Sequence, residues 1–227
     1  GKSWGQGPQH SQSIYPLFMN IPGLKIVAPS TPYDVKGCLI QSIRDNNPVI
    51  FIEHRLLYYQ KGYVPQKSYT VNFGKARILA EGRDITLVGI SYMAIECLRA
   101  RQYLKEVDVD AEVIDPISLG PLDTMTIELS LLKTKRLIVV DNAWINCGAG
   151  AEIIARIIER NNYKNIVFQR MGFEAVPCPT TPTLEEDFYP NAKKIASKAY
   201  KMLHPSEKPW QPDTKLKIEE IEFKGPF

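Results

Sequence analysis

Apolar positions along the chain alternate between short β-branched runs and stretches with helical spacing. The run at 24–28 predicts a strand, and the segment after it has the punctuation of a helix start. Thr31 is a good N-cap, Pro32 stands at the first helical position and Asp34 follows three residues after the cap. The apolar run 49–52 then predicts a buried strand. Strand, capped helix and strand make a βαβ unit, which implies a parallel sheet.

The helix that begins after Thr31 has one apolar face and a clear end. Asn47 before Pro48 ends it, because the residue before proline is pushed out of helical backbone geometry. Five positions share the face at helical spacing, and we expect them to pack on the core: Val35, Cys38, Leu39, Ser42 and Ile43.

Strand and helix patterns alternate through the second half of the chain, which predicts a doubly wound α/β domain. The predicted strands are 75–79, 85–90, 111–114, 137–140 and 166–168. The predicted helices are 92–105, one capped by Asp123, 150–158, a short one opened by the capping box Thr183–Glu186, and one from Asn191 to Leu203.

The alternation of strand and helix patterns is interrupted in two segments. Residues 58–73 mix tyrosines, Gln, Lys, Gly and Pro without a period, which suits a linker or edge hairpin, and we expect a domain boundary there. Residues 204–227 are polar and contain proline. Within them 215–223 could add an edge strand, but a tail that docks on a partner fits equally well.

Composition narrows the function classes. The 227 residues carry a net charge of +3 without a basic block, so we expect no nucleic-acid partner, and no apolar run approaches the length of a membrane span. The four cysteines are far apart and form no CxxC pair, which favours reduced thiols in a cytoplasmic-type compartment over disulfides or metal ligation.

The stretch 5–13 is the strongest candidate for chemistry. Its glycines and proline predict a loop or turn rather than a regular element, and the apolar run 14–21 can anchor it. His10 stands among five consecutive polar residues, and histidine can move protons near neutral pH. An ordinary surface histidine on a solvated loop is the alternative that the residues alone leave open.

A series of ordered motifs resembles one protein family over about residues 5–203. The chain is similar to the beta subunit of the thiamine-diphosphate-dependent decarboxylating component of 2-oxo acid dehydrogenase complexes, of pyruvate or branched-chain type, within the transketolase-like superfamily. The motifs are GPQHSQS at 7–13, PGLKIV at 22–27, PSTP at 29–32, IRDNNPV at 43–49, EHRLLY at 53–58, VIDP at 113–116, PLD at 121–123, GAEI at 150–153 and PCP at 177–179.

This resemblance implies a division of the chain and a role for His10. Residues 1–60 would be the C-terminal part of the thiamine pyrimidine-binding domain, 61–74 a linker, 75–203 a transketolase C-terminal-type domain and 204–227 a tail. His10 would be the catalytic residue, placed beside the thiazolium and handling the substrate-derived intermediate. The glutamate that protonates the cofactor's aminopyrimidine would lie upstream, so no cofactor-binding residue is expected in this chain, which alone would be inactive.

The same resemblance implies a structural potassium site and a set of partners. The site would use the Ser42 and Ile43 carbonyls with Asp45 and Asn47; a helix C-cap with turn-forming asparagines is the alternative. Thiamine diphosphate and magnesium would be held in the full complex, where the alpha subunit binds the diphosphate. A second beta subunit and a dihydrolipoyl acyltransferase would be further partners, in the cytoplasm or, in a eukaryote, the mitochondrial matrix.

Three functions follow as hypotheses. The first is oxidative decarboxylation of a 2-oxo acid, with pyruvate favoured, and acyl transfer to lipoamide. The second is an assembly module that docks the acyltransferase without chemistry of its own, and the third is another transketolase-type thiamine enzyme. We interpret Gly148–Gly150 as close helix–strand packing rather than a nucleotide fingerprint, Trp144 as a core or interface residue, and the cluster 53–55 as ion pairing at the end of a strand.

Overall fold

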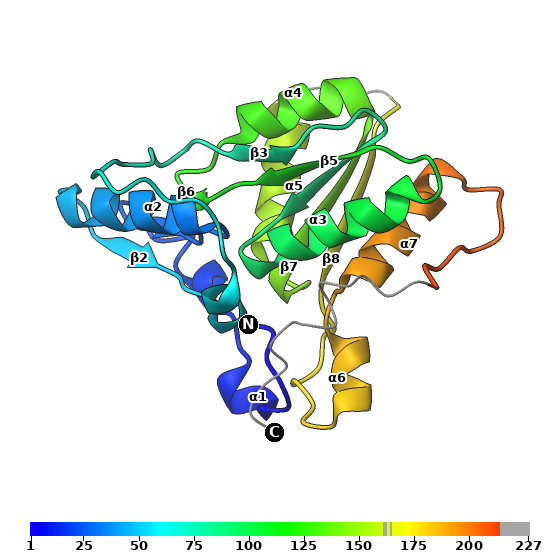
Figure 1. Ribbon diagram of the computed structural model, residues 1–227, viewed down its shortest axis with the longest axis horizontal. Coiled ribbons are helices and arrows are strands. Elements are labelled where there is room, and N and C mark those ends of the chain that lie inside the picture. The colour runs from blue at the N-terminus through cyan, green and yellow to red at the C-terminus, as the bar shows by residue number, and fades with distance from the viewer. Residues whose placement is uncertain (161–162, 164, 214–227) are drawn as a thin grey trace.

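A computed structural model describes residues 1–160, 163 and 165–213. Two sheets organise it (Figure 1). We call residues 1–73 the N-terminal region and residues 74–213 the C-terminal region. The predicted edge strand 215–223 lies outside the described residues.

The large sheet belongs to the C-terminal region and has the strand order β3-β5-β4-β7-β8. All neighbours pair in parallel except β3, which is antiparallel to β5. Its strands are β3 (Arg77–Ala80), β4 (Ile85–Gly89), β5 (Ala111–Asp115), β7 (Arg136–Trp144) and β8 (Val167–Phe173). The α/β class with a parallel sheet is confirmed, and β7 runs four residues beyond the predicted strand at its C-terminal end.

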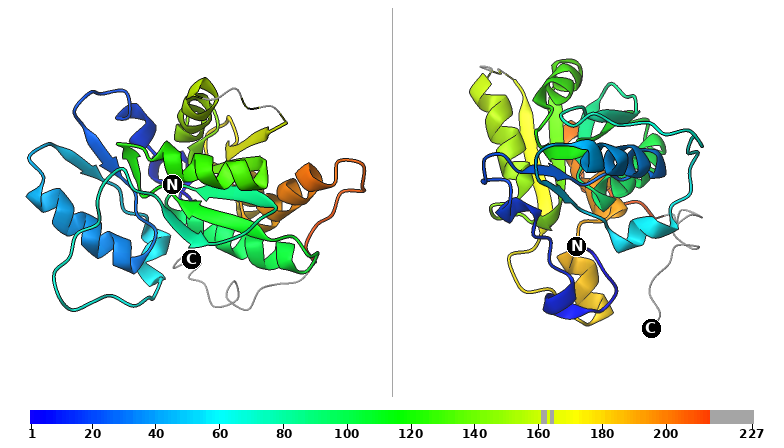
Figure 2. Two further views of the ribbon diagram at one scale, coloured as in Figure 1. Left: turned by 90° about the horizontal axis from the view of Figure 1, so that it is seen from above. Right: turned by 90° about the vertical axis from the view of Figure 1, so that its left-hand side faces the viewer.

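Helices cover both faces of this sheet because its strands are apolar on both sides (Figure 2). Leu87 and Ile138 face a core made with α3 (Tyr92–Lys105) and α7 (Ala192–Leu203). Val88 and Val139 face a second core made with α4 (Thr124–Thr134) and α5 (Ala149–Arg160). Neighbouring strand residues therefore serve opposite cores, as the alternation of side chains along a strand requires.

The small sheet joins the two regions. Its order is β2-β1-β6, where β1 (Lys25–Val27) pairs in parallel with β2 (Val49–Phe51) across the helix α2 (Pro32–Arg44). The βαβ unit is therefore confirmed. The third strand, β6 (Ser118–Gly120), comes from the C-terminal region and was not predicted. It is three residues long and pairs only with β1, so nothing local in the sequence marks it.

Helix punctuation from the sequence is largely correct. Thr31, Asp123 and Asn191 each accept a hydrogen bond from the backbone N–H three residues on, as N-caps do. The predicted capping box at Thr183 is wrong. The helix α6 (Pro182–Phe188) already begins at Pro182, one residue before Thr183, and no side-chain hydrogen bond caps it. The carboxylate of Glu185 is used elsewhere, as described below.

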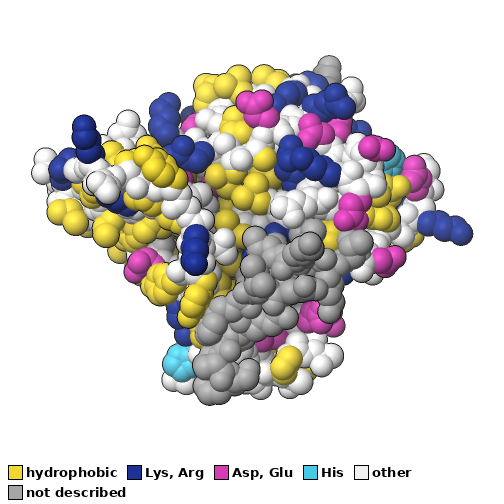
Figure 3. Space-filling view, viewed as in Figure 1, with side chains coloured by type: hydrophobic (Ala, Val, Ile, Leu, Met, Phe, Trp, Pro, Cys, Tyr) yellow, Lys and Arg dark blue, Asp and Glu magenta, His cyan; other side chains and the backbone are white. Residues whose placement is uncertain are grey.

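One predicted face is only partly buried. On α2, Cys38 is fully buried, but Leu39 is 47 % exposed and Ile43 is 79 % exposed. The prediction that this whole face packs on the core is wrong in this chain. Its apolar side chains instead reach the surface, where hydrophobic residues gather over α2 and the neighbouring 3-10 turn η2 (Arg55–Tyr59) (Figure 3).

Candidate active site around His10

The stretch 5–13 contains one turn of helix, so the prediction of a purely irregular loop is wrong for four residues. Helix α1 spans Gly7–His10, with Pro8 in its first turn, where proline is tolerated. His10 ends the helix and is exposed. Among the described residues, none hydrogen-bonds to its imidazole, which is therefore free to meet a substrate.

Both glycines that flank Gln6 are required by the backbone. Gly5 and Gly7 have φ of +69° and +63°, the left-handed region in which a side chain is strained. A Cβ at Gly7 would also lie 2.8 Å from Cγ2 of Thr180, and one at Gly5 would lie 3.2 Å from the Thr180 carbonyl. The His10 segment is thus pressed closely against the loop that precedes α6.

The apolar run 14–21 anchors the segment through one residue. Tyr15, in the 3-10 turn η1 (Tyr15–Leu17), is 1 % exposed, and its hydroxyl donates a short hydrogen bond to Asp141 Oδ1 on β7. Leu17 is 70 % exposed, so the rest of the run contributes less than the sequence suggested. Burial raises the pKa of both Tyr15 and Asp141.

Arg55 holds the His10 segment from the other side. Its Nη2 donates to Gln6 Oε1 at 2.5 Å and to the His10 carbonyl at 3.3 Å, and its guanidinium lies 4.8 Å above the Trp4 ring. We had interpreted Arg55 as part of an ion-paired cluster at a strand end. The structure differs because Arg55 reaches back across 45 residues to α1, a contact that local sequence does not reveal.

The other members of that cluster also differ from the prediction. Glu53 pairs with the Tyr58 hydroxyl, and desolvation, followed by the charge of Glu53, raises the pKa of Tyr58. His54 is 7 % exposed and its ring stacks on Tyr92 at 5.0 Å. Burial, together with nearby positive charges that include Lys2 and Arg55, lowers the pKa of His54 to about 3. His54 is therefore a buried, packed side chain rather than an exposed one like His10.

The predicted potassium ligands lie together at the C-terminal end of α2. Asp45 Oδ1 accepts from the backbone N–H and the side-chain amide of Asn47, both at 2.9 Å, and Oδ2 accepts from Lys25 Nζ at 2.5 Å. The lysine, followed by the Asn47 donors, lowers the pKa of Asp45 to about 2. The Ser42 carbonyl accepts from the Asp45 N–H at 3.4 Å. A cation bound here would share Asp45 with Lys25, and the potassium site stays a prediction.

The glycines at 148–150 serve packing, as the sequence indicated. A Cβ at Gly150 would lie 3.2 Å from Val139 Cγ1, and the Gly150 N–H donates to Asp141 Oδ2 at 3.0 Å. Trp144 is half-buried, packs edge-on against Phe173 at 6.0 Å and donates from Nε1 to the Val176 carbonyl. Trp144 is therefore a packing residue, as predicted.

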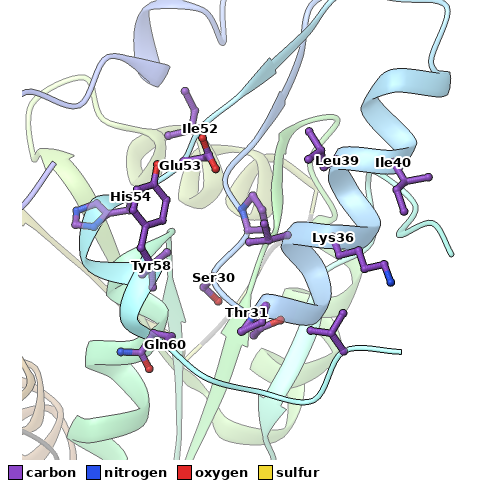
Figure 4. A pocket seen from close by; sticks show the side chains of 15 residues that line it. Ser30, Thr31, Lys36, Leu39, Ile40, Ile52, Glu53, His54, Tyr58 and Gln60 are labelled. Carbon is purple, nitrogen blue, oxygen red and sulfur yellow. The ribbon is translucent and has the colours of Figure 1, made fainter. Parts of the chain in front are cut away.

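A separate pocket of about 410 Å³ lies between α2 and the segment that leads into η2 (Figure 4). Its walls are largely apolar and include Val35, Leu39, Ile52 and Leu57. His10 does not line it. The sequence signal that could have indicated this pocket was the apolar face of α2, which we had assigned to the core.

The described residues contain no group of three or more His, Cys, Asp or Glu side chains that could hold a metal ion. All four cysteines are free, with only Cys147 exposed. No helix in the described part of the chain is long and apolar enough to cross a membrane. Among the described residues, the candidate for chemistry is the exposed imidazole of His10.

Comparison with known families identifies the class of protein to which this fold belongs. The family model for the transketolase C-terminal domain matches residues 74–195, and the model for the transketolase pyrimidine-binding domain matches residues 4–61. The chain belongs to this family.

The chain is similar in sequence to two kinds of curated beta subunit. The chain is 41% identical over 208 residues to the acetoin:2,6-dichlorophenolindophenol oxidoreductase subunit beta of Cupriavidus necator, with 89% of this chain and 60% of that protein covered. It is 41% identical over 181 residues to the pyruvate dehydrogenase E1 component subunit beta of Porphyra purpurea, with 79% and 55% covered. The chain thus spans about 60% or less of the length of these relatives.

A solved structure supports the fold. The chain is similar to a split gene transketolase, described as an inactive beta4 tetramer, with a TM-score of 0.68 and 19% sequence identity. The match covers 85% of this chain and 61% of the other. At this identity the likeness bears on the fold alone.

Proposed function

We propose that the complete protein is the beta subunit of a thiamine-diphosphate-dependent decarboxylating component of a 2-oxo acid dehydrogenase, with pyruvate as substrate. The observation that carries this proposal is His10, an exposed imidazole without a hydrogen-bond partner among the described residues, on a segment held by both regions. The identity of 41% to a pyruvate dehydrogenase beta subunit supports it.

When bound, thiamine diphosphate would supply a nucleophilic carbon and an electron sink for the decarboxylation. His10 then moves a proton or donates a hydrogen bond at the oxygen of the reacting carbonyl. Arg55 keeps α1 fixed through the His10 carbonyl, so the imidazole alone is free to turn. A complete assembly would add the magnesium diphosphate site, and the described residues hold no cluster of three or more His, Cys, Asp or Glu side chains.

The partners follow from the same proposal. An alpha subunit binds the diphosphate, a second beta subunit completes the heterotetramer, and a dihydrolipoyl acyltransferase accepts the acyl group. The domain limits of 1–60 and 75–203, with a linker at 61–74 and a tail at 204–227, belong to the proposal, as does potassium at Ser42, Ile43, Asp45 and Asn47. The protein would work in the cytoplasm or, in a eukaryote, the mitochondrial matrix.

Acetoin is a second candidate substrate. The relatives named for acetoin match 89% of this chain, whereas the pyruvate dehydrogenase relative from Porphyra matches 79%. The chemistry is related, because cleavage beside a carbonyl releases acetaldehyde from acetoin where it releases carbon dioxide from pyruvate. His10 would play the same part in both reactions.

The test uses the complete protein coexpressed with its alpha partner, thiamine diphosphate and magnesium. Reduction of an artificial electron acceptor is followed with pyruvate, with branched-chain 2-oxo acids and with acetoin. We expect reduction with pyruvate and one carbon dioxide released for every two electrons that the acceptor takes up. Reduction with acetoin alone, with release of acetaldehyde, would move the assignment to the second candidate. A well-formed complex that reduces the acceptor with none of them would contradict both and leave an assembly role.

A further inference from the structure

The His10 segment, residues 5–13, packs against one end of the C-terminal region. Helices α1 and α6 lie side by side at the lower end of the molecule (Figures 1 and 2). The Gly5 N–H donates to Glu185 Oε2 at 2.8 Å, across 180 residues of sequence. Glu185 lies on the inner side of α6 and is 8 % exposed, whereas its neighbour Glu186 is exposed. A glutamate of α6 thus fixes the backbone just before α1.

A chain of hydroxyl groups fixes the backbone just after α1. Ser11, which follows His10 directly, is fully buried, and its Oγ lies 2.6 Å from Ser3 Oγ. Both hydroxyls hydrogen-bond to the hydroxyl of Tyr189, which in turn lies 3.0 Å from Cys178 Sγ. The Tyr189 ring is held edge-on against Phe173 at 4.9 Å. Both ends of the short helix are therefore attached to α6 and to Tyr189, the residue that follows it.

Stability alone does not account for Glu185. Its Oε1 is buried and has no hydrogen-bond partner among the described residues, although a buried carboxyl group normally needs partners for both oxygens. Burial raises the pKa of Glu185, and the Gly5 N–H and the charge of Lys2 counteract this. The one hydrogen bond that Glu185 does accept, from the Gly5 N–H, is explained by the position it imposes on the His10 segment.

We propose that Glu185 and Tyr189 are positioning residues that hold both ends of α1, and so set the place of His10 in the reaction. The proposal rests on the function proposed above. It extends that function to the C-terminal region, whose contribution would be to orient a catalytic group carried by the N-terminal region. A displacement of a catalytic group by about 1 Å can lower a rate by about 100-fold, so such holding contacts have large kinetic effects.

The test has a structural and a kinetic arm, both on the complete beta chain in complex with its alpha partner. Glu185→Ala removes the acceptor, Glu185→Gln keeps an acceptor oxygen, and Tyr189→Phe removes only the hydroxyl. Glu186→Ala on the exposed side of the same helix is the matched control. Hydrogen exchange of the peptide that spans Gly5 to Ser13 reports whether the segment is held, independently of activity.

In the structural arm we expect faster exchange of this peptide in Glu185→Ala and Tyr189→Phe, and wild-type exchange in Glu185→Gln and Glu186→Ala. In the kinetic arm we expect Glu185→Ala to lower kcat about tenfold, with KM changed less and Glu185→Gln restoring most of the loss. If Glu185 acts through His10, its replacement in a His10→Asn background should change kcat by less than about twofold.

Two results would overturn the proposal. One is wild-type exchange of the segment in both Glu185→Ala and Tyr189→Phe. The other is an equal loss of kcat from Glu185→Ala with and without His10, which would show that Glu185 acts by another route. Failure of the proposed function is seen separately, as a well-formed wild-type complex that reduces the acceptor with none of the substrates. The exchange measurement does not depend on activity and would then still show whether the segment is held.

Discussion

The two regions of this molecule use apolar residues differently. In the C-terminal region, every residue of β4 is buried, and nine residues of α3 are buried beneath it. In the N-terminal region, no residue of β2 is fully buried, and α2 presents Leu39 and Ile43 to solvent. The C-terminal region therefore carries a complete two-sided core. The N-terminal region takes a strand and most of its anchoring from that neighbour.

The contrast indicates that the packed core and the candidate catalytic residue lie in different regions. The region with the complete core holds no candidate catalytic residue, and the region with the exposed apolar surface carries His10. A rigid domain that positions a loop on a neighbouring element is a common way to build a site. The contacts between the two regions are accordingly the place where stability and activity should be linked.

The largest effect is expected from pH at this junction. Asp115 on β5 is buried and accepts from the Ser30 N–H at 3.2 Å and from the Ile117 N–H at 2.8 Å. Burial raises its pKa to about 7. The folded chain therefore binds more protons than the unfolded chain between about pH 4 and about pH 7. The free energy of unfolding should fall as pH rises through this window, by up to about 1.4 kcal/mol per pH unit, and level off above it.

Asp115→Asn isolates this contribution. Urea unfolding of the wild type and of Asp115→Asn is compared at about pH 5 and about pH 8. The wild type should lose more stability than the variant between the two values. Equal losses in both proteins would show that Asp115 does not titrate in this window.

A matched pair of leucines tests the difference between the regions directly. Leu104 on α3 is fully buried and Leu39 on α2 is 47 % exposed. Leu104→Ala should lower the free energy of unfolding by about 3 kcal/mol, because it leaves a cavity in a packed core. Leu39→Ala should cost less than about 1 kcal/mol. Similar costs, measured by urea unfolding, would mean that the N-terminal region has a core of its own.

Arg77 tests the link between the regions. Its guanidinium on β3 binds Asp34 at the start of α2 with distances of 2.5 to 3.0 Å, and Asp34 is fully buried. Arg77→Leu leaves that carboxylate without its cation and should cost about 2 kcal/mol. Asp34→Asn combined with Arg77→Leu should recover part of the loss. No recovery would indicate that Arg77 acts through packing rather than charge.

The smallest expected change in stability concerns the contact between the His10 segment and Thr180. Gly7 and Gly23 both have positive φ, so either replacement by alanine should cost about 1 kcal/mol of backbone strain. Only at Gly7 would the new Cβ meet a neighbour, Thr180 Cγ2 at 2.8 Å, while nothing lies within 4 Å at Gly23. Thermal unfolding should therefore rank Gly7→Ala below Gly23→Ala. Equal midpoints would show that Thr180 moves aside without cost.

Local signals predicted most of the fold. Caps at Thr31, Asp123 and Asn191 mark helix starts because they depend on residues three positions apart. The strands of the large sheet are apolar enough to be found from composition alone. Strand β6 was not predicted because its pairing with β1 spans about ninety residues of sequence and consists of two residue pairs.

The candidate site was predicted less fully, for the same reason. His10 came from a motif, and its exposure agrees with a functional role. The residues that hold it, Arg55, Glu185 and Tyr189, come from distant segments. The sequence predicted a capping box between Thr183 and Glu186, and it gave Glu185, which lies between them, no role of its own. Sequence spacing does not reveal its hydrogen bond with the Gly5 N–H.

The central claim, that His10 is the chemical group supplied by this chain, is tested most directly by one rate. kcat with pyruvate is measured for the complete assembly carrying His10→Asn and, as a matched control from the same exposed turn, Gln9→Ala. The account predicts that His10→Asn lowers kcat by at least about 100-fold with an unchanged unfolding midpoint, and that Gln9→Ala stays within about twofold of the wild type. A His10→Asn enzyme within about twofold of the wild type would contradict it.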